Sequence, residues 1–426
     1  MSPLVNNREE GCQFAEQRID FVNMVLLVLS VVFVAFPLGI NMTIPYALKI
    51  PVLLLWYFDC IIKGSCYLSK ILSTIIICFA IILYEFLYIF IGYSTASIGN
   101  FYNTIIYYDI IIKSFYVMIA YNIRAKKIVF RIIQIYLIFV CLINGVYANM
   151  MQHFYDEGGL ALLLDEIGTA GTPTEFYNML IFYVAANVYV LFNEKRILLK
   201  ILDLSAVLAS FFFIFSYHTR ATSLFLMIFL SLLLLLNRNV KTYSLNNIFS
   251  STIMIGVFLS VIMFVVGDII VEIIPERVAE RLQAMLDLIK GEGDGSDSIY
   301  LARFGLNRIS INTWLSSAKS TLFGVGNHLG RDHYDLIGQH SFYIDYLAKY
   351  GILGTSLVIV SLKSFVKTAK RCASDSSQYF FFIIFFFVYV VLGFFAKSGF
   401  AIIALGAFLY SQLALSTIRY CDAIQH

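Results

Sequence analysis

The chain has 426 residues, of which 60% are hydrophobic, and its mean hydropathy is +0.82. Charged residues make up 13% of it, about half of the roughly 25% usual in soluble globular domains. A soluble fold could not bury this much apolar surface, and a net charge of +3 with scattered lysines and arginines is not that of a nucleic-acid-binding protein. The composition predicts an all-α polytopic membrane protein.

Apolar stretches long enough to span a bilayer, which takes about 20 residues per helix, occur about twelve times. The first six are Phe21–Leu38, Ala47–Ile62, Ile71–Gly92, Asn103–Ile123, Ile128–Tyr147 and Phe176–Phe192. The other six are Leu198–Tyr217, Ala221–Leu236, Ile248–Val271, Ser341–Leu362, Tyr379–Phe395 and Ala401–Leu415. We therefore treat residues 1–426 as a single integral membrane domain.

Basic residues indicate the orientation of the spans, because cytoplasmic loops carry an excess of Lys and Arg. With the N-terminus inside, eighteen of the 30 basic residues fall in cytoplasmic segments. They include Lys63 and Lys70 between the second and third spans, and a cluster from Arg124 to Arg131. We expect both termini in the cytoplasm, and the cluster to act as an orientation signal that attracts anionic lipids.

The longest connection, about 70 residues (272–340), lies outside between the ninth and tenth spans. It holds seven of the remaining basic residues and three of the six histidines. Apolar spacing predicts an amphipathic helix over Pro275–Ile289 and a second helix from Ser298 to about Lys319, with Gly324-Val-Gly326 after its end. Such helices are expected to lie in the membrane interface.

Arginines on the outer side are the first candidates for a site. Arg220 stands in a short outer turn, where it could either snorkel to the interface or bind an anion. Arg303 and Arg308 lie on the second loop helix, with Asn307 and Ser310 near the face of Arg303. They could be a solvated face, or join Arg220 in an anion clamp, because guanidinium groups bind phosphate in a bidentate manner.

His340 directly precedes the tenth span, with Ser341 placed to cap that helix. It is either a polar interface residue or a general base, a role that its ordinary pKa near 6.5 allows. The spacing of His328, His333 and His340 does not match known zinc-binding helical pairs. No phosphate loop or dinucleotide fingerprint is present, so neither a metal nor a cofactor is expected.

Ionisable and amide side chains inside the predicted spans are candidates for function by default. Asp109 and Lys113 are four residues apart and can neutralise each other. Glu85 and Asn187 have no local partner in the sequence, and each could equally take part in a hydrogen bond within the bundle.

The segment from His340 to Gly354 resembles a known signature. His340, Ser341, Gly351 and Gly354 fill the H-[N/S/Q]-x9-G-x-x-G pattern of the O-antigen polymerase and O-antigen ligase superfamily of bacterial envelope enzymes. Upstream, Arg220 in Thr219–Thr222 resembles the arginine of that family's shorter catalytic loop. Arg303, Trp314 and Gly324-Val-Gly326 resemble the arginine, tryptophan and G-x-G of its large loop, in the same order.

The resemblance implies a GT-C-like, metal-independent glycosyltransferase in the bacterial inner membrane, with its active site on the outer face. Its donor would be an undecaprenyl-pyrophosphate-linked oligosaccharide. Arg220 and Arg303 would stabilise the departing pyrophosphate, with Arg308 a weaker candidate, and His340 would take the acceptor's proton. We assign Arg308, Ser341 and Asn307 to substrate binding.

The acceptor separates two members of that superfamily. A polymerase uses a second lipid-linked repeat unit, whereas a ligase uses lipid A–core. The His-Ser start and the Tyr-Gly-Ile-Leu-Gly ending look more like the polymerases, for which the resemblance also implies a chain-length regulator protein as partner. A lipid-linked oligosaccharide flippase has a similar number of spans but does not need a basic, histidine-bearing outer loop.

Overall fold

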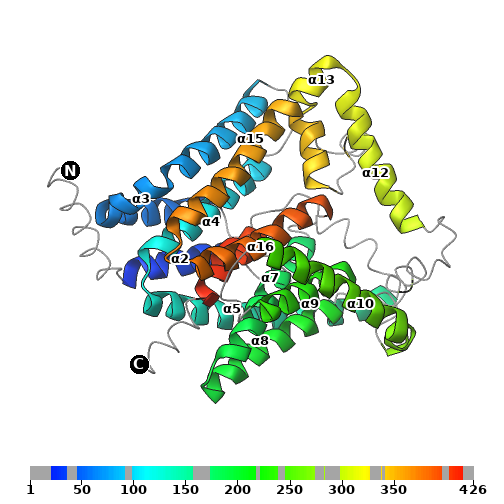
Figure 1. The fold of residues 1–426 in the computed structure, drawn as a ribbon. Coiled ribbons are helices and arrows are strands. Elements are labelled where there is room, and N and C mark those ends of the chain that lie inside the picture. Colours follow the sequence, from blue (N-terminus) through cyan, green and yellow to red (C-terminus); the bar gives the residue numbers. More distant parts are fainter. Residues whose placement is uncertain are drawn as a thin grey trace.

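A computed structural model describes residues 21–35, 46–91, 98–156, 173–216, 221–237, 245–273, 298–326, 341–395 and 403–415, with single positions at 283 and 337. Every regular element in these ranges is a helix (Figure 1). The first eight are α2 (Phe21–Val34), α3 (Tyr46–Phe90), α4 (Ile98–Ala120), α5 (Ile123–Asp156), α7 (Pro173–Asn193), α8 (Ile197–Ser216), α9 (Ala221–Leu236) and α10 (Leu245–Ile273). The others are α12 (Ser298–Leu315), α13 (Ala318–Phe323), α15 (Phe342–Cys372), α16 (Ser376–Phe395) and the π-helix η1 (Leu405–Tyr410).

Within the described ranges, six helices are long and apolar enough to cross a membrane, and four shorter helices are also apolar. Exposed side chains along them are largely Leu, Ile, Val and Phe, as expected where the solvent is lipid. The chain is therefore a helical membrane protein, as its composition predicts.

One expected boundary is wrong. We expected a cytoplasmic connection at Lys63–Lys70 between two spans, but α3 continues as helix from Tyr46 to Phe90, 45 residues in all. The intervening segment has a single glycine and no proline, and one glycine in a helix costs only about 1 kcal/mol. Within α3, Tyr67–Phe90 is the part that is long and apolar enough to span.

The core lies where two groups of helices meet. In Figure 1, α2, α3, α4 and α15 form one group, and α5, α7, α8, α9 and α10 form the other, with α16 between them. The π-helix η1 contacts α4, α7 and α16, so it joins the two groups. All six of its residues are buried.

Arg131 is the centre of a buried polar network, not the lipid-facing charge that its place in the Arg124–Arg131 cluster suggests. Its guanidinium binds Asp203 of α8 and, at 3.2 Å, Glu194 after α7. Gln134 donates to Asp203 at 2.7 Å and to Asn187 at 2.6 Å. Asn187, which has no local partner in the sequence, thus has one on α5. Desolvated charges are tolerated when they are paired and hydrogen-bonded in this way. The network ties α5 to α7 and α8.

The Asp109–Lys113 pair is confirmed. The Lys113 Nζ lies 2.8 Å from an Asp109 carboxylate oxygen, and both side chains are buried. Lys113 also donates to the Ser30 hydroxyl at 2.9 Å, and its ammonium lies 5.1 Å from the Trp56 ring centroid. One cation therefore joins α2, α3 and α4.

Lys113→Met should destabilise the bundle by about 3–5 kcal/mol, because it leaves Asp109 as an uncompensated buried charge. Lys113→Met combined with Asp109→Leu should recover most of this loss, because it removes both charges. Thermal unfolding of the detergent-solubilised protein measures the effect. Equal destabilisation by the single and double variants would contradict a charge-pairing role.

Candidate functional site

Three of the six predicted site residues lie within the described side chains: Ser341, Asn307 and Arg308. Arg303 lies in α12, but its side chain is outside the described set, and Arg220 and His340 are outside the described residues. So is the predicted helix Pro275–Ile289, apart from Gln283. The site is therefore built from the segments that carry these residues, α12, α13 and the first part of α15.

Ser341 caps α15, as the sequence predicts. Its hydroxyl accepts a hydrogen bond from the Ile344 N–H at 3.5 Å, and its own N–H donates to the Asp345 carboxylate at 3.3 Å. The side chain of Ser341 is buried. Because helix N-termini leave backbone N–H groups without helical partners, these bonds fix where α15 begins.

Gly351 interrupts α15 after its first nine residues. Its φ of 63° and ψ of −166° are not helical, and Figure 1 shows the bend below α13. An interruption there frees carbonyls that would accept hydrogen bonds within a continuous helix. Those of Ala348 and Lys349 instead accept from the N–H groups of Val325 and Gly326, at 2.9 and 2.8 Å. The nine residues between the serine and the glycine are thus one short helix, capped at Ser341 and ended at Gly351.

Both segments need glycine where they meet. A Cβ on Gly351 would lie 2.4 Å from the Leu322 carbonyl carbon and oxygen, and one on Gly324, at φ 77°, would lie 2.3 Å from those of Lys349. These are backbone atoms, which cannot relieve the clash by rotating away as a flexible side chain could. The G-x-G and H-S-x9-G-x-x-G motifs therefore pack backbone against backbone, although they are separate in the sequence.

Trp314 sets the turn between α12 and α13. Its indole N–H donates to the Thr321 carbonyl at 3.0 Å, and the Thr321 hydroxyl donates back to the Trp314 carbonyl at 3.1 Å. Ser317 and Ser320 form a capping box at the start of α13. The predicted helix over 298–319 is thus two helices, because the Ser316-Ser317 turn ends the first at Leu315.

The face of α12 that packs on α15 is polar. The Ser310 hydroxyl donates to Asp345 at 2.7 Å, and both side chains are buried. Asn307, one turn earlier, has a buried Oδ1 with no hydrogen-bond partner among the described residues. Arg308 is exposed. Of the three residues predicted near one face of this helix, Asn307 and Ser310 both have buried polar atoms, and the Arg303 side chain is outside the described set.

Apolar side chains are exposed on both α12 and α13. Ile311 and Leu315 of α12 and Leu322 and Phe323 of α13 are all more than a third exposed. Helices that bury serine and threonine while exposing leucine and phenylalanine suit the boundary between lipid and headgroups.

Tyrosines at the end of α3 complete the junction, and the sequence analysis missed them. Tyr88 donates to the Phe323 carbonyl, and Tyr84 donates to the Tyr350 carbonyl at 3.2 Å. Glu85, between them, accepts from the Tyr346 hydroxyl at 3.4 Å, which supplies the partner that the sequence did not show. No motif marks these positions; only the helical spacing of Tyr84 and Tyr88 could have placed them on one face.

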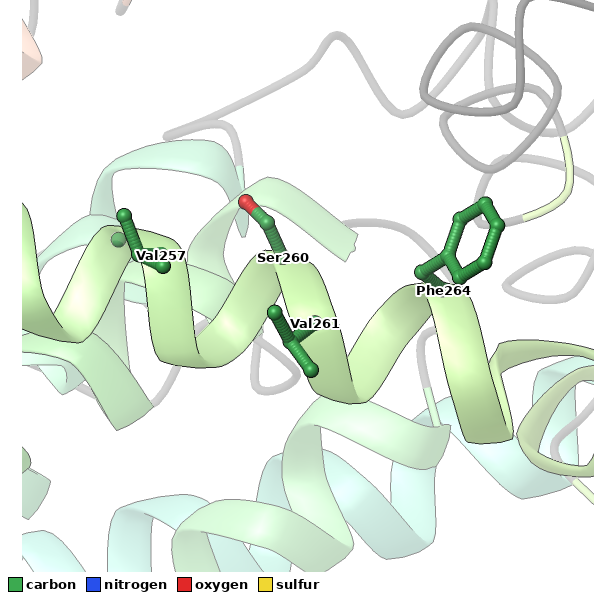
Figure 2. A pocket seen from close by; sticks show the side chains of 5 residues that line it. Val257, Ser260, Val261 and Phe264 are labelled. Atoms are coloured by element: carbon green, nitrogen blue, oxygen red, sulfur yellow. The ribbon is translucent and has the colours of Figure 1, made fainter.

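A groove of about 470 Å³ lies elsewhere, on α10 (Figure 2). Gly256, Val257, Ser260, Val261 and Phe264 line it, and none of them is a predicted site residue. Apart from the Ser260 hydroxyl, its walls are apolar side chains on a membrane helix. No charged side chain is among the described residues that line it.

Comparison with known proteins adds no relative: no protein-family model matches the chain, and no curated protein matches it.

Gly351→Ala should destabilise the junction, because a backbone with φ 63° and ψ −166° costs a non-glycine residue about 1–3 kcal/mol and the new methyl group would meet backbone atoms. The matched control is Gly305→Ala on α12, where a Cβ would meet nothing within 4 Å. Removing a helical glycine there should be neutral or stabilising. Thermal unfolding of the solubilised variants gives the comparison, and equal midpoints would contradict the packing described here.

Proposed function

We propose that the chain is a polysaccharide polymerase of the bacterial inner membrane. It would transfer a glycan from undecaprenyl pyrophosphate onto a new lipid-linked repeat unit, in O-antigen or capsule biosynthesis. The observation that supports this most is the packing of Gly324-Val-Gly326 against Gly351, because it unites the two glycine motifs on which the family resemblance rests.

The reaction needs an electrophile, a leaving group and a base. The acceptor hydroxyl attacks the anomeric carbon, the bond to the pyrophosphate oxygen breaks, and that oxygen keeps the electron pair. Arg220 and Arg303 would stabilise the growing negative charge, with Arg308 contributing less. His340 would take the proton of the acceptor hydroxyl. The sugar–pyrophosphate bond supplies the driving force, so the transfer consumes no ATP, and independence from a metal ion is what the family resemblance implies.

Other side chains would hold the substrate. Asn307 offers a carbonyl oxygen that no described residue uses, and it could accept from a sugar hydroxyl. Exposed Arg308 lies beside it and could contact a phosphate. Ser341 keeps His340 at the start of α15, because its own position is fixed by two capping hydrogen bonds.

The remaining features belong to the same proposal. The bundle would have about twelve spans in a GT-C-like arrangement, with both termini in the cytoplasm and the site on the outer face. Residues 272–340 would form the external catalytic loop. The exposed apolar side chains of α12 and α13 support a position of this loop at the membrane surface, where a lipid-linked donor presents its pyrophosphate.

Arg220→Ala, Arg303→Ala and His340→Ala should each abolish glycan extension while the protein stays in the membrane. Removing a single hydrogen-bond donor that stabilises charge in the transition state lowers kcat about 10²- to 10³-fold. The assay is a gel of surface glycan from a deletion strain that expresses each variant. Lys367→Ala, at an exposed position near the other end of α15, is the control and should give full-length chains.

The gel pattern also identifies the acceptor. A polymerase defect leaves core carrying one repeat unit. A ligase defect would leave bare core with accumulated lipid-linked polymer, and a flippase defect would leave cytoplasmic intermediates. Wild-type chain lengths from all three variants would overturn the proposed site.

A further inference from the structure

Asp345 is a buried carboxylate with a partner on each oxygen. Its side chain is only 3% exposed. Oδ1 accepts from the Ser310 hydroxyl at 2.7 Å, and Oδ2 accepts from the Ser341 N–H at 3.3 Å. Hydrogen bonds to an ionised acceptor are shorter and stronger than neutral ones. The carboxylate also lies in the first turn of α15, where the helix dipole favours negative charge.

The two partners of Asp345 belong to different parts of the proposed site. Ser310 is on α12, two turns after Arg303 and one turn after Asn307. Ser341 directly follows His340 and caps α15. A single carboxylate therefore joins the helix that carries the proposed charge-stabilising arginine to the point where the proposed base enters α15.

We propose that Asp345 is a positioning residue for glycan transfer: its carboxylate holds α12, the helix that includes position 303, and the start of α15, which directly follows His340 in the sequence, at a fixed separation. The inference rests on the proposed function, and it adds a residue outside the motif positions that carry the family resemblance.

The packing of α13 explains why such a tie is needed. The segment that follows α13 meets α15 through hydrogen bonds from the N–H groups of Val325 and Gly326 to the carbonyls of Ala348 and Lys349, about one turn beyond Asp345. That contact sets the far end of the first part of α15. At the N-terminal end of α15, which follows His340 in the sequence, the hydrogen bond from Ser310 to Asp345 connects α12 and α15. Loss of that tie would alter the placement of reacting groups, where an error of about 1 Å can cost 10²-fold in rate.

The test compares Asp345→Asn with Asp345→Glu and with Ser364→Ala. Asparagine keeps one acceptor for Ser310 but loses the charge and offers an N–H₂ group to the Ser341 N–H. Glutamate restores the carboxylate on a longer arm. Ser364→Ala is the matched control, because it removes a buried hydroxyl bond on the same helix, 3.1 Å from Thr74 and far from Ser341.

Two measurements are made on purified full-length protein. Extension of a lipid-linked repeat unit gives kcat per folded molecule and KM, and hydrogen exchange followed by mass spectrometry gives the protection of α12. Asp345→Asn should lower kcat about 10- to 100-fold with KM changed less than about threefold, and exchange in α12 should become faster. Asp345→Glu should recover part of kcat, and Ser364→Ala should leave kcat and α12 exchange unchanged.

A residue that only supported folding would reduce the amount of folded protein and leave kcat per folded molecule unchanged. That result, or unchanged exchange in α12, would overturn the proposal. If the wild-type protein extends no glycan, the proposed function fails instead, and the exchange data still decide whether Asp345 ties the two helices.

Discussion

The interruption of α15 at Gly351 is the constraint on which the junction of α3, α12, α13 and α15 depends. A continuous helix would use the carbonyls of Ala348 and Lys349 internally and would leave the N–H groups of Val325 and Gly326, after α13, without these partners. The break instead presents these carbonyls to Val325 and Gly326. Glycine on both sides allows the backbones to approach closely enough for those bonds to form. Within a membrane protein, backbone outside a helix is tolerated where protein buries it and satisfies its hydrogen bonds.

Buried charge in the rest of the bundle follows a similar rule. Arg131 of α5 is paired with Asp203 of α8 and with Glu194 after α7. Lys113 is paired with Asp109 of its own helix and also donates to Ser30 of α2. The desolvation free energy of an unpaired charge in this environment would exceed the stabilisation that packing of its side chain provides. These buried charges therefore help to connect helices, and Asp345 does the same where α12 meets α15.

Local features were predictable from the sequence, because neighbours along the helix decide them. Ser341 as a cap and Asp109 with Lys113 both depend on residues no more than four positions away. The shared face of Asn307 and Ser310 follows from helical periodicity in the same way.

Partners that come from distant helices could not be found in this way. The sequence around Arg131 indicates a cytoplasmic surface charge. In the structure, Arg131 binds Glu194 and Asp203, which follow it by 63 and 72 residues. Tyr84 and Tyr88 read as ordinary span residues, because their acceptors belong to segments some 235 to 266 residues away. The continuity of α3 differs from the prediction for a local reason. The basic residues Lys63 and Lys70 indicate a cytoplasmic connection, but no residue between them ends a helix.

The central claim, that this bundle elongates a glycan by direct displacement of pyrophosphate, is tested most directly with the purified protein and an undecaprenyl-pyrophosphate-linked repeat unit in the presence of EDTA. The account predicts a ladder of products, with one undecaprenyl pyrophosphate released for each repeat added. Failure to form any ladder, or polymerisation that stops with the chelator and returns with a divalent cation, would contradict it.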